Sequence, residues 1–163
     1  MSFEVDMRKF VAKAKDNADQ VVGTTVWDII KEIDFRSPVG NPSVWKDWKE
    51  GSIADNADHW LVKSGFVKEG YAGGHFRGNW QLGIGSLPTG TIDGIDPTGV
   101  ATIMKAYAKI PKKAAGLVYY YANNLPYAIP LEEGHSHKAP NGMVGLTAVR
   151  FQSMIQKNLA RLK

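Results

Sequence analysis

A stripe of apolar side chains over the first part of the chain most constrains the fold. Apolar residues recur at steps of three and four residues from Phe3 to Ile33, a spacing that places them on one face of an α-helix. We therefore predict a long amphipathic helix that Ser37-Pro38 ends. A glycine inside a helix costs about 1 kcal/mol relative to alanine, so a break between Asp19 and Gly23 is an open alternative. The stripe could cover a sheet or form a seam with another copy of the chain, and we slightly prefer the first interpretation.

The last third of the chain predicts a strand, a stiff turn, a polar loop and a helix in succession. Leu117 to Asn123 is rich in the β-branched and aromatic residues that are typical of strands. Pro126 and Pro130 restrict the backbone that follows, so we expect an extended or turn-like segment there, with a short strand at Ile129–Leu131. After the polar loop, Met143 to Leu162 has the apolar pattern of a helix.

A second strand is predicted from Phe76 to Gly85, where apolar and polar side chains alternate. The alternation places Arg77 on the polar side of this strand, directed away from the core. We expect its partner to be the carboxylate of Glu132 or Glu133, on the same chain or on an adjacent copy. An ordinary surface ion pair within the chain is an equally favoured alternative.

Residues between these segments complete the fold prediction. Asp96-Pro97 combines a helix N-cap with a proline suited to the first turn, so a helix is expected from Pro97 to about Lys109. Three tryptophans lie in the connection before the first strand, which indicates a satellite core or a docking surface; they are Trp45, Trp48 and Trp60. We predict an α+β fold in which a long N-terminal helix and two further helices pack on a small antiparallel sheet.

Length and composition agree with a compact cytoplasmic protein. A chain of 163 residues that is 44% hydrophobic suits a single domain. We divide it into the N-terminal helix (1–36), the Trp-containing connection (37–74) and a strand-helix-strand-loop-helix core (75–163). The chain has no cysteine and no apolar run of membrane-spanning length, so we expect neither disulfides nor membrane insertion.

The charge of the chain is unevenly distributed. The net charge is +4, and no acidic residue follows Glu133. The C-terminal helix is therefore basic, and basic surfaces favour contact with polyanions, although a solvated face is the preferred interpretation. The candidate DNA-facing residues are Arg150, Lys157, Arg161 and Lys163.

Residue patterns that would indicate catalysis are weak. His135 and His137 lie close behind Glu132 and Glu133, and imidazole and carboxylate groups are ordinary zinc ligands. The spacing does not match the helical metalloprotease pattern, however, and the flanking prolines and glycines favour a loop. We expect no enzymatic activity, no bound metal and no cofactor.

Several motifs in register resemble one protein family. They are Ser37-Pro38-Val39-Gly40-Asn41-Pro42 followed by Trp45, Gly74-His75-Phe76-Arg77-Gly78-Asn79-Trp80-Gln81 followed by Gly85, and the stretch from Asn123 to Thr147. Together they resemble the neck and tail-completion proteins of tailed bacteriophages. This chain departs from the family pattern at Glu133 and at His137-Lys138.

The resemblance implies a virion structural protein at the neck, assembled in the host cytoplasm. It implies a homo-oligomeric ring, a hexamer or dodecamer, around the channel through which genomic DNA passes. The neighbours would be the head-connector and tail or terminator proteins. The implied contact residues are Arg77, Asn79, Trp80, Leu131, Glu132, Glu133, Gly134, His135, Ser136, Pro140, Gly142 and Met143.

Three alternatives remain open. A tail terminator, which caps the tail tube, is the nearest role within the same class of protein. A nucleic-acid-binding protein would use the basic C-terminal helix. A metal-dependent hydrolase would use His135 and His137.

Overall fold

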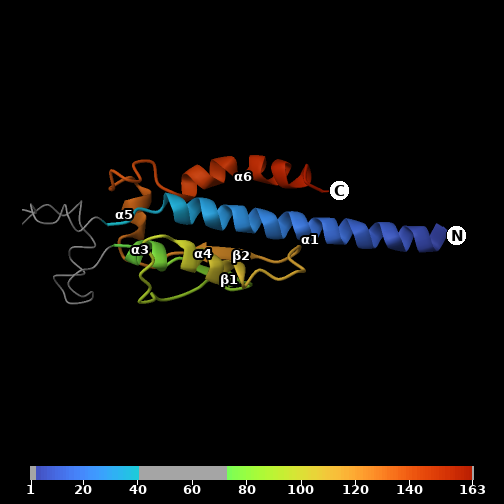
Figure 1. Ribbon diagram of the computed structural model, residues 1–163, viewed down its shortest axis with the longest axis horizontal. Helices are drawn as coiled ribbons and strands as arrows, with labels where there is room; N and C mark the ends of the chain where they lie inside the picture. Colours follow the sequence, from blue (N-terminus) through green and yellow to red (C-terminus); the bar gives the residue numbers. More distant parts are fainter. Residues whose placement is uncertain (1–2, 41–72, 163) are drawn as a thin grey trace, which may run out of the picture.

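The protein has an α+β fold that is mostly helical, as predicted. The computed structural model describes residues 3–40 and 73–162 (Figure 1). Most of the Trp-containing connection, with Trp45, Trp48 and Trp60, lies outside the described residues. In chain order the elements are α1 (Phe3–Arg36), α3 (His75–Gly78), β1 (Gln81–Ile84), α4 (Val100–Tyr107), β2 (Tyr119–Ala122), α5 (Ala128–Glu132) and α6 (Val144–Leu159).

Helix α1 runs without a break, so the alternative of an interruption between Asp19 and Gly23 is wrong. The turn that follows α4 packs on the helix at this point. The Asp19 carboxylate accepts a hydrogen bond from the backbone N–H of Ala115 at 2.8 Å. A Cβ at Gly23 would lie in ordinary contact with Ala114 and Ile110. These tertiary contacts offset the weak helix propensity of glycine.

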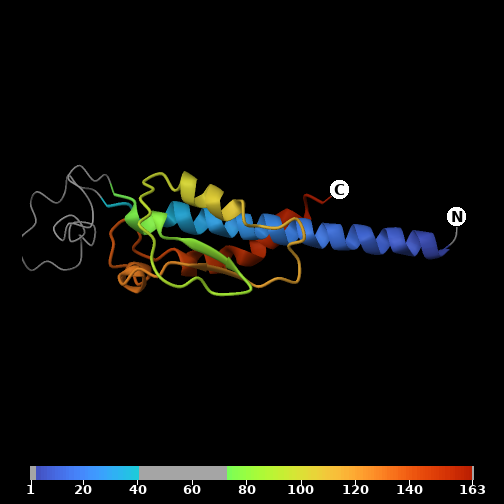
Figure 2. The same cartoon turned by 90° about the horizontal axis from the view of Figure 1, so that it is seen from below.

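The elements form layers around the C-terminal half of α1. Helix α6 lies along one side of α1, and the sheet lies on the other side (Figures 1 and 2). Strands β1 and β2 pair in antiparallel register, with Gln81 opposite Ala122 and Ile84 opposite Tyr119. The predicted antiparallel sheet is therefore confirmed, and α1 is the wall shared by both layers.

Two buried clusters join these layers. The first draws on α1, α3 and the loop before α6, and it consists of Ile33, Phe76, Trp80, Leu125, Ala139 and Met143. The second lies between α1, β1 and α4, and it consists of Ile30, Leu82, Ile103 and Ala106. Tyr121 of β2 packs against both clusters, so α1 and β2 connect them into a continuous interior.

The predicted strand from Phe76 to Gly85 is too long, because its first residues form the short helix α3. The backbone of Gly78 touches that of Gly94, where a Cβ on Gly78 would lie 2.4 Å from a carbonyl oxygen. Phe76 and Trp80 share a buried side in either conformation, since residues two or four apart lie on one face of a strand and residues four apart on one face of a helix. The apolar alternation alone could not separate these two structures.

The predicted extended segment at Ile129–Leu131 is also wrong, because these residues belong to α5. Pro130 occupies the first turn of this helix. A proline is tolerated there because the first backbone N–H groups of a helix have no partner within it. We correctly expected Pro130 to restrict the backbone angles, but we placed it in an extended segment and not in the first turn of a helix.

The two later helices are confirmed with shorter bounds than predicted. Asp96 stabilises the start of α4, where its carboxylate accepts hydrogen bonds from the N–H groups of Gly99 and Thr102, each at 2.8 Å. The apolar face of α4 is only partly buried, because Val100 and Met104 remain about half exposed. No helix within the described residues is long and apolar enough to cross a membrane.

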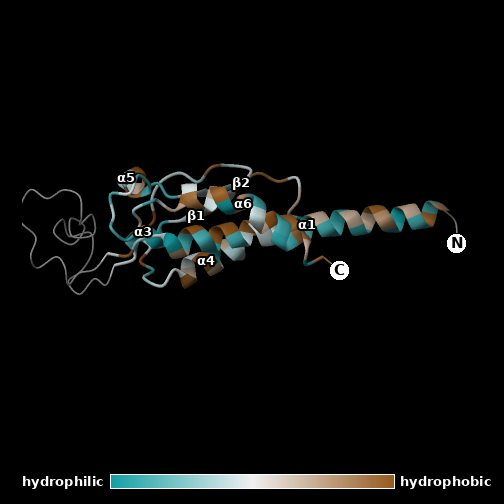
Figure 3. Ribbon diagram, turned by 90° about the horizontal axis from the view of Figure 1, so that it is seen from above, coloured by the Kyte–Doolittle hydropathy of each residue, from teal (hydrophilic) through white to brown (hydrophobic). Residues whose placement is uncertain are grey.

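The N-terminal half of α1 is the part that least matches expectation. Residues 3–16 are all exposed, and this half projects past the end of α6 and past the sheet (Figures 1 and 2). Its apolar side chains include Phe3, which is 81% exposed, and Phe10, which is 68% exposed. In Figure 3, hydrophobic and hydrophilic stretches alternate along the ribbon of this half. Only the C-terminal half of α1 therefore covers the sheet.

Candidate functional site

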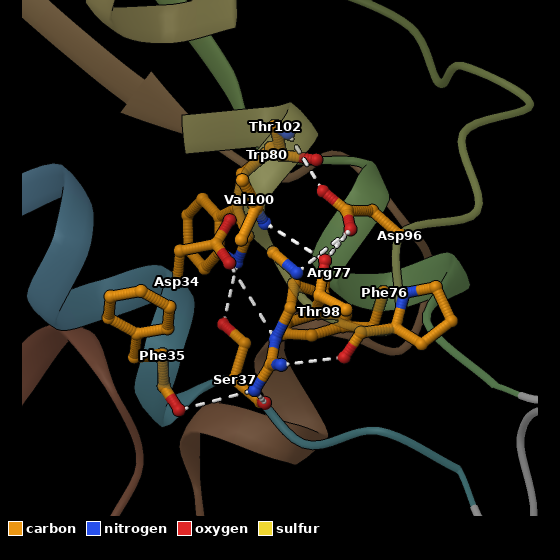
Figure 4. A network of polar contacts seen from close by, with 12 residues as sticks. Asp34, Phe35, Ser37, Phe76, Arg77, Trp80, Asp96, Thr98, Val100 and Thr102 are labelled. Atoms are coloured by element: carbon orange, nitrogen blue, oxygen red, sulfur yellow. Dashed lines mark hydrogen bonds and ion pairs between the residues drawn. The ribbon is translucent and has the colours of Figure 1, made fainter. Parts of the chain in front are cut away.

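Arg77 holds the C-terminal end of α1 (Figure 4). Its guanidinium donates hydrogen bonds to the carbonyl oxygens of Phe35 at 3.2 Å, Ser37 at 2.7 Å and Pro97 at 2.8 Å. The last carbonyl groups of a helix have no partner within it and carry partial negative charge, so a cation is favourable there. The expected pairing of Arg77 with Glu132 or Glu133 is wrong, because the side chain bonds within its own chain at α1.

Asp34 is the buried acidic partner of Arg77. Its side chain is fully buried, and one carboxylate oxygen lies 3.6 Å from the Arg77 Nε. Neither of these two atoms has a hydrogen-bond partner within the described residues. Burial raises the pKa of Asp34 to about 7, although the charge of Arg77 acts in the opposite direction. Asp34 is thus a carboxyl group at the centre of the fold whose pKa is close to neutral pH.

Trp80 and Asn79 fix the same region through polar atoms inside the core. The indole N–H of Trp80 donates to the Ser37 hydroxyl at 2.7 Å, and this hydroxyl donates to the carbonyl oxygen of Ile33 at 2.8 Å. The Asn79 side chain donates to the carbonyl oxygen of His75 and accepts from the N–H of Ile92, each at 2.8 Å. Arg77 and Trp80 therefore support the end of α1 directly, whereas Asn79 links α3 to the segment at Ile92.

Glu132 joins α5 to α6. Its carboxylate accepts hydrogen bonds from the backbone N–H groups of Met143 at 2.9 Å, Val144 at 3.0 Å and Gly145 at 2.8 Å. Burial acts to raise the pKa of Glu132, but these three bonds outweigh it and hold the pKa below its usual range. Glu132 thus satisfies the otherwise unpaired N–H groups at the start of α6.

The rest of the predicted contact loop divides into buried and exposed residues. Met143 lies in the core, and Gly142 is buried with φ +70° beside the carbonyl oxygen of Glu132. Gly134 also has positive φ and lies against the backbone of Pro140. Leu131 and Ser136 are half-buried, and three members of the set face outward: Glu133, His135 and Pro140. The assembly role of this loop stays a prediction, and only the outward members offer side chains for it.

The basic residues of α6 lie over a groove between α1 and α6. The groove has a volume of about 470 Å³ and contains four cations around two carboxylates: Lys31, Arg36, Arg150 and Lys157 around Asp28 and Glu32. Arg150 pairs with Glu32 at 2.9 Å, and Lys157 lies 3.8 Å from Asp28. Arg161 instead donates to Asn158 at 3.4 Å, and Lys163 lies outside the described residues. The cations exceed the carboxylates by two, so the groove keeps a positive charge.

Metal binding finds no geometric support in the described parts of the chain. There, no three His, Asp or Glu side chains come together in a way that could hold a metal ion. His135 and His137 are exposed loop residues. Among the histidines of the described residues, His75 is buried, and its Nδ1 lies 2.9 Å from the Tyr127 hydroxyl.

Sequence reasoning did not identify Asp34 as a central residue. Asp34 is one of several acidic residues in a helical pattern, and no motif singles it out. The useful signal would have been position: Asp34 is spaced four residues from the core residue Ile30 and next to Ile33, and so shares the buried side of the helix.

Replacing Asp34 with asparagine should change the pH dependence of stability. The folded pKa of Asp34 of about 7 lies above the usual unfolded value of about 3.9. Its favourable contribution is therefore complete below about pH 4 and is lost as the pH rises to 7, by up to roughly 4 kcal/mol. Denaturant unfolding between pH 4.5 and 8 should show Asp34→Asn gaining stability relative to the unmodified chain as the pH rises. A difference that stays constant with pH would contradict the assignment.

Removing the Glu132 carboxylate should destabilise the start of α6. Glu132→Ala leaves three backbone N–H groups without their acceptor, a loss comparable to a helix N-cap and worth about 1–2 kcal/mol. The neighbouring exposed residue gives a matched control, because Glu133→Ala should change stability by less than about 0.5 kcal/mol. Thermal unfolding of the two variants measures the difference, and equal melting temperatures would show that the three bonds contribute nothing.

The chain matches no known protein family, no curated protein and no solved structure. The resemblance to phage neck and tail-completion proteins stays a prediction from the short motifs of the sequence.

Proposed function

We propose that this chain is a virion structural protein of a tailed bacteriophage, part of the neck that completes and joins the tail. In this role it forms a homo-oligomeric ring around the DNA channel, next to the head-connector and tail or terminator proteins. The observation that carries the proposal is the exposed N-terminal half of α1, whose apolar side chains the described chain leaves uncovered. An uncovered apolar surface of this kind marks a site of contact with another protein.

The polar groups of the described fold support an assembly role more than a catalytic one. Arg77 and Glu132, the most specific polar residues of the motifs, bond to backbone groups at helix ends. Both side chains therefore hold parts of the fold together. A folded scaffold with a projecting amphipathic helix suits a component of a larger particle.

Two further surfaces suit the proposed position in the neck. The outward residues of the α5–α6 loop, Glu133, His135 and Pro140, offer a polar contact to a neighbouring protein. The α1–α6 groove has more cations than carboxylates, which is favourable where a surface faces the phosphates of DNA. We assign the loop to subunit or neck contacts and the groove to the channel.

The tail terminator remains the second candidate, because its assembly surfaces would have the same character. A nucleic-acid-binding protein is favoured by one observation, the positive groove. Its binding would fall steeply as salt concentration rises. For a metal-dependent hydrolase, the described residues bring together no suitable cluster of ligands.

Electron microscopy of particles assembled without this chain tests the proposal. A phage that lacks the gene should give filled heads beside separate tails of normal length, because the joining component is missing. Restoring the gene in a parallel culture should restore complete virions and serves as the control. Overlong tails would move the chain to the terminator role, and normal infectious virions would refute a structural role in the particle.

A further inference from the structure

The arm, which we define as residues 3–16 of α1, has the pattern of a helix that pairs with another helix. All its residues are exposed, and the described elements of the chain lie elsewhere (Figures 1 and 2). Phe3, Met7, Phe10 and Ala14 follow one another at steps of four, three and four residues. Alternating steps of four and three residues separate successive d and a positions of a heptad, so these residues form the narrow apolar seam that is typical of a coiled coil.

The seam continues into the part of α1 that the chain itself covers. Val21 and Thr25 lie on the same helical face as Ala14, and both are buried beneath the rest of the fold. One face of a single helix is therefore covered over its C-terminal half and exposed over its N-terminal half. The exposed half needs a narrow apolar partner of similar length, and another helix of the same kind provides one.

Charged residues beside the seam indicate which kind of helix binds the arm and whether the two helices run parallel or antiparallel. Asp6 and Lys13 directly precede the seam residues Met7 and Ala14, so they lie on the same flank of the helix. Neither forms an ion pair within the described residues, in contrast to Glu4, which pairs with Arg8. The flank thus carries one negative and one positive charge, two helical turns apart.

In an antiparallel pair of arms, these charges complement each other twice. Placing Met7 opposite Phe10 of the second copy also places Phe3 opposite Ala14. Each apolar layer of the pair then contains one phenylalanine. In this register Asp6 of each copy lies beside Lys13 of the other copy, and both pairs form at once. In a parallel pair this flank of one helix and the same flank of the other lie on opposite sides of the seam, so Asp6 and Lys13 of the two copies do not meet and neither ion pair forms.

We propose that the arm binds the arm of a second copy of this chain in an antiparallel two-helix coil. The inference extends the proposed function, on which it rests for its place in the virion, by naming the partner of the arm. Such a contact has two-fold symmetry and cannot by itself close a ring. It therefore links a protomer of the ring to a protomer outside that ring.

Cross-linking with introduced cysteines tests the direction of the pair, because the natural chain contains no cysteine. Two single variants of the full chain, Phe3→Cys and Ala14→Cys, are purified and treated with a short thiol-reactive cross-linker. We expect a covalent dimer when the two variants are mixed, and little dimer from either variant alone. Dimers from Phe3→Cys alone would indicate parallel helices, and the absence of dimers in every sample would refute the pairing.

Charge reversal tests the register. Asp6→Lys places two repulsive pairs in the coil, and its dimer should dissociate about tenfold more readily, since exposed ion pairs are each worth up to about 1 kcal/mol. The combined variant Asp6→Lys/Lys13→Asp restores both pairs and should regain the original affinity within about twofold. Lys9→Glu, on the outer face of the helix, is the matched control and should leave the affinity unchanged. Sedimentation velocity over a range of concentrations measures all four proteins.

A combined variant that stays as weak as Asp6→Lys would overturn the proposed register. Circular dichroism of each variant verifies that the helix content is unchanged, so a loss of pairing is not a loss of folding. These measurements use purified protein and are independent of the particle experiment. A dimer in solution together with normal virions from a phage that lacks the gene would refute the proposed function and leave the pairing in place. Separate heads and tails without the gene, together with no dimer in solution, would do the reverse.

Discussion

The fold depends on the attachment of the C-terminal end of α1 by Arg77. One guanidinium group binds the carbonyl oxygens of Phe35, Ser37 and Pro97, so it joins the helix end to the segment that begins α4. Because the helix has no interruption, fixing one end also directs the other end past the remainder of the fold. The same contact that completes the interior therefore determines where the arm projects.

The buried Asp34 makes this attachment sensitive to its surroundings. A carboxylate placed beside a guanidinium inside a protein gains attraction but loses hydration, and the two effects are similar in size. The rise of the Asp34 pKa to about 7 shows that the loss of hydration dominates. The backbone of Gly99 packs directly against Asp34, because a Cβ at Gly99 would lie 2.0 Å from an Asp34 carboxylate oxygen. Glycine at this position and the charge of Arg77 together allow α4 to approach α1.

Sequence patterns predicted the elements whose burial repeats regularly, and they failed where single contacts decide. The structure confirms the helix α1, the helix α6 and the aromatic strand β2 as elements. The predicted apolar face of α6 is not its buried face, because Phe151 and Leu159 are about half exposed while Thr147, Met154 and Asn158 are buried. Phe76 and Trp80 fit a strand and a helix equally well, and the close approach of Gly78 to the backbone of Gly94, 16 residues away, is not visible in a local pattern. The predicted site was recognised as a set of motifs, but the roles of Arg77 and Glu132 depend on backbone atoms far away in the sequence, which no local pattern reveals.

Hydrogen–deuterium exchange of the full chain at several protein concentrations tests the central claim that α1 is one helix with two differently covered halves. The account predicts that amides of residues 21–36 are protected at every concentration, because the chain itself covers them. Amides of the arm should gain protection only as the concentration rises and copies of the chain associate. Equal and concentration-independent protection of both halves would contradict the account, because the arm would then need no partner.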